Sequence, residues 1–101
     1  MAARVITTPD AEQDIADAAD WYARDRPGRE VKFLARVDEC MTTISRVPRG
    51  GRPLRANYRQ AVVRRFPYVV VYRFEDATDT VTVYAVFHTS QDPQKLLDRL
   101  P

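Results

Sequence analysis

Hydrophobic residues recur with two different periods along the chain, which divide it into a helical first half and a strand-rich second half. Ala3–Thr7 is predicted as a short strand, after which Thr8 and Pro9 form the start signal of a helix. The apolar stripe of this helix repeats every three or four residues, and its aspartates are expected to face water. The stripe comprises Ala11, Ile15, Ala18, Ala19 and Tyr22, and the aspartates are Asp14, Asp17 and Asp20.

A second helix is predicted from about Arg29 to Arg46, directly after Pro27 and Gly28 end the first one. Its apolar positions form a broad face, made of Val31, Phe33, Leu34, Val37, Cys40, Met41 and Ile44. Two amphipathic helices joined by so short a turn indicate an αα-hairpin. A loop rich in proline, glycine and arginine follows the hairpin.

The second half carries three predicted strands, Tyr58–Arg65, Tyr68–Phe74 and Thr80–His88, joined by short turns as an antiparallel meander. Asp92 and Pro93 then open a short helix that runs through Leu100. Strict alternation in the last strand puts two sets of residues on opposite faces. One set is Val81, Val83, Ala85 and Phe87; the other is Thr80, Thr82, Tyr84, Val86 and His88.

These elements predict one α+β domain over residues 1–101, with the helical hairpin packed on one face of a curved sheet. The opposite face is expected to stay open and concave. We expect Arg59, Arg65, Arg73 and His88 to gather there, which would make that face the functional surface.

Charge is distributed unevenly, although the net charge is only +2. Residues 1–39, 40–74 and 75–101 carry −3, +8 and −3, and the middle segment has eight arginines and no acidic residue. Such a concentration of guanidinium groups favours contacts to phosphates or to an acidic peptide. The alternative is a solvated arginine-rich surface. The candidate binding residues are Arg52, Arg55, Arg59, Arg64, Arg65 and Arg73.

Several classes of protein and site are disfavoured by the composition. One histidine and one cysteine are too few for a usual zinc site, and neither a glycine-rich phosphate loop nor a serine nucleophile motif is present, so no metal or cofactor is expected. Cys40 alone cannot form an intrachain disulfide. Without a long apolar run we expect a cytoplasmic protein that does not enter a membrane.

Nearly the whole chain resembles the RelE/ParE superfamily of toxins from type II toxin–antitoxin systems, closest to its ParE branch. The resemblance rests on the order of Arg59, Phe66-Pro67-Tyr68, Tyr72-Arg73, His88 and Asp92-Pro93 on the predicted elements. It implies a toxin neutralised by a cognate antitoxin, whose segment covers the hairpin and the sheet groove in a hetero-oligomer. An acidic antitoxin segment would match the arginine-rich middle of the chain.

The resemblance leaves two toxic activities open. The ParE branch is associated with poisoning DNA gyrase, and the RelE branch cleaves mRNA on the ribosome. Cleavage of RNA without a metal needs a base, an acid and cations, and His88, Tyr72 and Arg73, with Arg59 and Arg65, are the candidates.

Departures from the RelE pattern favour a toxin that binds its target. The chain has no lysine between Lys32 and Lys95 and no tyrosine after Tyr84. His88 also has a structural interpretation, as a strand-end histidine that hydrogen-bonds the next loop. A third hypothesis is a regulatory module that binds antitoxin without being toxic.

Overall fold

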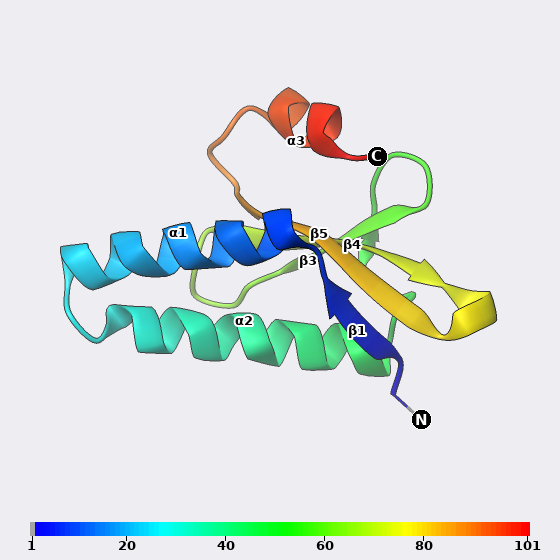
Figure 1. The fold of residues 1–101 in the computed structure, drawn as a ribbon, viewed down its shortest axis with the longest axis horizontal. Helices are drawn as coiled ribbons and strands as arrows, with labels where there is room; N and C mark the ends of the chain where they lie inside the picture. The colour runs from blue at the N-terminus through cyan, green and yellow to red at the C-terminus, as the bar shows by residue number, and fades with distance from the viewer. Residues whose placement is uncertain (1) are drawn as a thin grey trace.

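The computed structural model describes residues 2–101, which form a five-stranded sheet and three α-helices (Figure 1). The sheet has the order β1-β5-β4-β3-β2, in which β1 runs parallel to β5 and all other neighbours are antiparallel. The predicted α+β class is confirmed. The elements are β1 (Arg4–Thr7), α1 (Pro9–Asp25), α2 (Arg29–Arg46), β2 (Arg52–Pro53), β3 (Tyr58–Val62), β4 (Tyr68–Glu75), the 3-10 turn η1 (Asp76–Thr78), β5 (Thr80–His88) and α3 (Pro93–Arg99).

The helical hairpin forms where the sequence predicts it. Thr8 caps α1 by accepting a hydrogen bond from the Ala11 N–H at 3.2 Å, and Pro9 occupies the first turn. Gly28 adopts φ +97° between the two helices, a left-handed conformation that glycine takes without strain. The Glu30 carboxylate accepts the Gly28 N–H at 2.9 Å, which fixes the start of α2.

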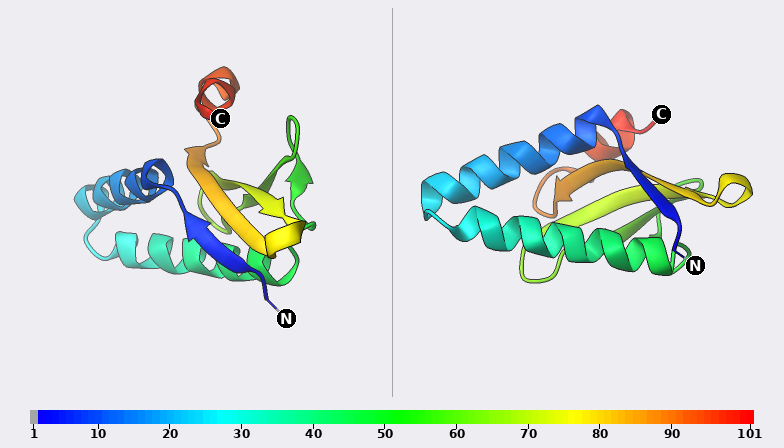
Figure 2. Two further views of the ribbon diagram at one scale, coloured as in Figure 1. Left: turned by 45° about the vertical axis from the view of Figure 1, so that its right-hand side comes forward. Right: turned by 60° about the horizontal axis from the view of Figure 1, so that its bottom comes forward.

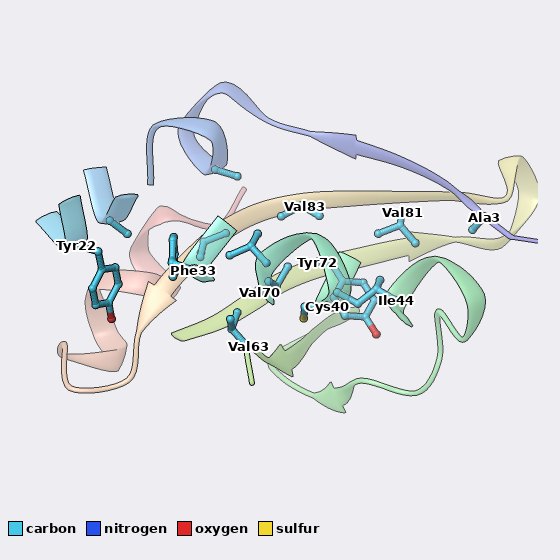
Figure 3. Packing of buried hydrophobic residues seen from close by; sticks show 14 residues of the cluster. Ala3, Tyr22, Phe33, Cys40, Ile44, Val63, Val70, Tyr72, Val81 and Val83 are labelled. Atoms are coloured by element: carbon cyan, nitrogen blue, oxygen red, sulfur yellow. The ribbon is translucent and has the colours of Figure 1, made fainter. Parts of the chain in front are cut away.

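The hairpin buries its inner side against one face of the sheet (Figure 3). The α1 residues Ala11, Ala18 and Tyr22 are buried there as predicted. The predicted α2 face is too broad, because Val31 and Leu34 point outward and remain 64% and 42% exposed. The sheet and α1 contact only the narrower stripe of α2, whose buried residues are Phe33, Val37, Cys40 and Ile44.

The opposite face of the sheet is not open, which corrects the sequence prediction. The short helix α3 lies on the side of the sheet away from α2 (Figure 2), and its Leu96, with the following Leu100, packs into a second apolar cluster. The sheet contributes Tyr58, Val71, Ala85 and Phe87 to this cluster.

A pair of side chains joins α3 to α1. Arg99 donates two hydrogen bonds to the Asp14 carboxylate, at 3.0 and 2.8 Å. The same carboxylate accepts the Val86 N–H at 3.0 Å. Asp14 is therefore a structural acceptor, and the prediction that it faces water is wrong.

A β-bulge in β5 changes which residues share a face. Val71 pairs with Ala85 while Tyr72 pairs with Val83, so Tyr84 has no partner on β4. Val83 and Val86 consequently both face the hairpin, whereas Ala85 packs against α3. The strict alternation predicted for this strand is wrong beyond the bulge.

Candidate partner-binding surfaces

The structure does not gather the candidate arginines and His88 on one face, which corrects the prediction. Arg73 lies on the α3 side of the sheet, with its guanidinium 5.7 Å from the Tyr58 ring and 5.9 Å from the Tyr84 ring. Arg59 pairs with Tyr72 in the sheet and so points to the other side, where it donates to the Gly51 carbonyl at 2.9 Å.

The other four candidate arginines lie at three separate places. Arg64 and Arg65 belong to the turn between β3 and β4, and Arg64 forms an ion pair with Glu39 at 2.9 Å. Arg52 is on the edge strand β2. Arg55 donates to the Leu97 carbonyl of α3 at 3.0 Å. The arginines that cluster in one segment of the sequence are therefore spread over separate places on the folded protein.

His88 has the loop contacts of the structural interpretation. Its Nδ1 accepts the Ser90 N–H at 3.0 Å and lies 2.7 Å from the Ser90 hydroxyl. Its ring packs edge-on against Tyr68, with 5.0 Å between centroids, in a hollow beside α1 that Trp21 and Asp14 also line. Because Nδ1 accepts from a backbone N–H, the proton of the neutral ring resides on Nε2.

Tyr72 is fully buried, and its hydroxyl holds the loop after α2. This hydroxyl donates to the Pro48 carbonyl at 2.8 Å and accepts the Gly51 N–H at 3.0 Å. Burial raises the pKa of Tyr72, an effect that the Gly51 hydrogen bond and Arg59 oppose. A neutral, enclosed phenol fits a structural role.

No acid–base set is assembled from His88, Tyr72 and Arg73. His88 pairs with Tyr68, and Arg73 is five positions further along β4, which corresponds to roughly 17 Å along the strand. The two side chains also lie on opposite faces of the sheet. Residues 2–101 contain no group of three or more histidine, cysteine or acidic side chains able to hold a metal ion. None of the described helices is long and apolar enough to cross a membrane.

A groove between α2 and the outer strands is the surface that the sequence prediction missed. Its volume is about 550 Å³, and its floor includes Cys40, Ile44 and Ala61. Val47 on its wall is 57% exposed. Val62 at its edge is 70% exposed, but it pairs with Val69 in the sheet, so its side chain points to the α3 side. Three arginines, Arg36, Arg52 and Arg64, stand around it.

The edge of β3 runs along this groove. β2 covers β3 only at Arg59 and Gln60, and no described strand pairs with Ala61 or Val62 on that side. Burial raises the pKa of the Cys40 thiol in the floor to about 11, with a smaller contribution from Glu39. The groove thus combines an exposed valine, a cationic rim and an open strand edge, which is the combination that an extended peptide can use.

Comparisons with known proteins agree on one family. A family model described as the ParE toxin of the type II toxin–antitoxin system parDE matches residues 5–93. The toxin ParE2 from two strains of Mycobacterium tuberculosis is 29% identical over 94 residues, covering 92% of this chain and 88% of that protein.

Two solved structures share the fold. The chromosomal ParDE system from P. aeruginosa matches with a TM-score of 0.77 at 17% identity, covering 87% of this chain and 97% of that chain. The toxin–antitoxin complex RelBE2 from M. tuberculosis matches with a TM-score of 0.61 at 30% identity, covering 87% of this chain and 99% of that chain.

Proposed function

We propose a function for this chain, which belongs to the ParE toxin family of type II toxin–antitoxin systems. The toxin arrests growth in the cytoplasm by binding an essential target such as DNA gyrase. A cognate antitoxin neutralises it. The observation that supports binding over RNA cleavage is the separation of the candidate catalytic residues. His88 and Arg73 lie on opposite faces of the sheet, and Tyr72 is buried between the sheet and the hairpin. A concerted proton transfer requires its acid and base within hydrogen-bond reach of one substrate.

The groove between α2 and β3 is our proposed antitoxin site. A peptide strand added to β3 at Ala61 and Val62 would extend the sheet, and its alternating apolar side chains would cover Val47 on the α2 side and Val62 on the α3 side. Acidic residues on the same peptide would meet the arginines of the rim. The likeness to the toxin–antitoxin complex RelBE2 supports an antitoxin partner for this chain.

The groove is tested with two valines of similar exposure. Val47→Asp places a charge in the groove, whereas Val31→Asp places the same charge on the outer side of α2, outside the groove. Each variant is produced with the antitoxin encoded beside the toxin gene. Val47→Asp should no longer copurify with the antitoxin and should remain toxic in its presence, while Val31→Asp should behave as wild type. Equal effects of the two variants would place the antitoxin elsewhere.

The target is tested with purified toxin. Inhibition of supercoiling by DNA gyrase, or accumulation of cleaved DNA, is the expected result. Primer extension on translated mRNA is the companion assay. New cuts that disappear in the His88→Ala variant would replace our proposal by RNA cleavage. Unimpaired growth on expression without antitoxin would instead indicate a non-toxic regulatory module.

A further inference from the structure

A second surface, at the tip of the helical hairpin, concentrates cations from three segments of the chain. It is a basin of about 950 Å³ beside the turn between β3 and β4. We call it the basic basin and define it by five side chains: Arg26 after α1, Arg29, Lys32 and Arg36 on α2, and Arg65 in the turn. Four of the five lie in residues 1–39, whose net charge is −3, so the summed charge of that segment does not reveal this cluster of cations.

The α2 cations are arranged along one side of the helix. Arg29, Lys32 and Arg36 are spaced by three and four residues, which puts them on one face. From Arg29 to Arg36 the helix rises about 10 Å, close to the axial length of three phosphate-to-phosphate steps on one strand of duplex nucleic acid. Arg26 and Arg65 widen this row into a basin.

Few carboxylates neutralise the basic basin. Within residues 2–101, the ion pairs near it are Arg29 with Asp25 at 3.6 Å and Arg36 with Glu39 at 3.1 Å. Glu39 is the acidic residue in the lining, and it also pairs with Arg64, so one carboxylate serves two guanidinium groups. No ion pair among the described residues includes the exposed side chains of Arg26, Lys32 or Arg65.

Arg65 occupies an unfavourable backbone conformation. Its φ is +69°, in the left-handed region that glycine and asparagine adopt with less strain than arginine. The turn is closed by hydrogen bonds from Val63 N to the Tyr68 carbonyl and from Tyr68 N to the Phe66 carbonyl, which hold this conformation in place. A strained residue that carries an exposed charge into a cluster of like charges indicates a functional constraint.

The composition of the basic basin fits phosphate better than an acidic peptide. Four of its five cations are arginines, whose planar guanidinium groups form paired hydrogen bonds to phosphate oxygens. A bound peptide gains much of its affinity from apolar anchors in pockets, and here the lining offers only the half-buried Phe66 ring among large apolar side chains. The apolar groove further along α2, which shares Arg36 with the basic basin, supplies such anchors instead.

We propose that the basic basin binds the phosphate backbone of a nucleic acid, without reading its sequence. The contacts come from Arg26, Lys32 and Arg65, with Arg29 and Arg36 contributing where their carboxylate partners release them. This inference does not depend on which target the toxin poisons. It gives the toxin a second contact, to nucleic acid, whether its protein target is bound to DNA or to RNA.

The test uses Arg65→Gly, because this change removes the cation and also relieves the left-handed strain. The control is Arg46→Gln, which lowers the net charge equally at an exposed position outside the basin. Fluorescence anisotropy follows the binding of labelled 20-nucleotide RNA, single-stranded DNA and duplex DNA across a series of salt concentrations. Thermal unfolding is measured on the same samples.

Arg65→Gly should weaken binding about threefold to tenfold and lower the slope of log K against log salt by about 0.7 for single strands or 0.9 for duplex. Its melting temperature should equal or exceed that of the wild type, and Arg46→Gln should change binding less than twofold. The three probes distinguish RNA from DNA as the source of the phosphates.

Three results would overturn the proposal. One is the absence of salt-dependent binding to every nucleic acid probe. Another is an equal loss of affinity in Arg65→Gly and Arg46→Gln. The third is a polyglutamate chain of matched length that binds as tightly, with the same dependence on Arg65, which would assign the basic basin to an acidic protein partner. All three leave gyrase inhibition and antitoxin binding by the groove to be decided by their own assays.

Discussion

Replacing Tyr72 by phenylalanine removes one oxygen atom and two hydrogen bonds from the base of the loop after α2. The hydroxyl donates to the Pro48 carbonyl at 2.8 Å and accepts the Gly51 N–H at 3.0 Å. Phenylalanine fills nearly the same volume, so packing of the ring in the core is retained. The change therefore isolates the hydrogen bonds from the hydrophobic contribution of the fully buried ring.

The expected loss of folding free energy follows from the Pro48 carbonyl and the Gly51 N–H, which both lose their hydrogen-bond partner. An unsatisfied buried donor or acceptor costs about 1 to 3 kcal/mol. The loop lies close to solvent, where water can replace part of the interaction, so we take about 2 kcal/mol for the pair. For a domain of this size each kcal/mol lowers the melting temperature by roughly 4 to 8 °C. Tyr72→Phe should therefore melt roughly 8 to 16 °C below the wild type.

Thermal unfolding by circular dichroism gives the first measurement, and growth arrest at a permissive temperature gives the second. If Tyr72 is structural, the folded variant should keep its toxicity at temperatures well below its melting point. A melting temperature within about 2 °C of wild type, together with complete loss of toxicity, would refute this reasoning. It would restore Tyr72 as a residue that acts on the target.

Two further predictions concern Cys40 and the pair that joins α3 to α1. With a pKa of about 11, Cys40 is only about 0.1% thiolate at pH 8, so an alkylating reagent should modify it about a hundredfold more slowly than an ordinary thiol of pKa 9.0; equal rates would show that the groove opens. The raised pKa stabilises the fold fully below pH 9, and this contribution is lost as the pH rises toward about 11, which alkaline unfolding would detect. Asp14→Ala should lower the melting temperature by roughly 8 to 16 °C, and more than Arg99→Ala does, because Asp14 also accepts the Val86 N–H. A larger effect of Arg99→Ala would contradict this order.

Local signals were sufficient to predict most of the elements. Thr8 and Pro9 start α1, Pro27 and Gly28 separate the helices, and Asp92 with Pro93 starts α3. Each of these signals acts through its own backbone or its immediate neighbours, so it can be recognised without the rest of the fold. The short strand β2 was missed because two residues carry no period.

Long-range contacts account for what the sequence did not predict. α3 covers the second face of the sheet through Leu96 and Leu100. These side chains pack against residues that lie up to several tens of positions away in the sequence. The groove between α2 and β3 exists only because folding brings Val47 and Ala61 to its two sides. The basic basin likewise joins Arg65 to the hairpin tip. Hydrophobic period and segment charge describe neighbours along the chain, and these surfaces are made by neighbours in space.

One residue in β5 decides whether His88 and Arg73 could share a site. Arg73 pairs with Thr82, and His88 is six positions beyond Thr82. In a regular strand an even separation would put His88 on the same face as Thr82 and Arg73, as the sequence prediction assumed. Tyr84 is an extra residue without a partner on β4, so the residues after it are shifted by one position in the alternation. This shift turns His88 toward Tyr68 and the hairpin. Since a bulge inverts the alternation for the rest of a strand, the separation of these two candidates is a property of the backbone. No rotation of either side chain can remove it, and for this reason we favour a toxin that binds its target over one that cleaves RNA.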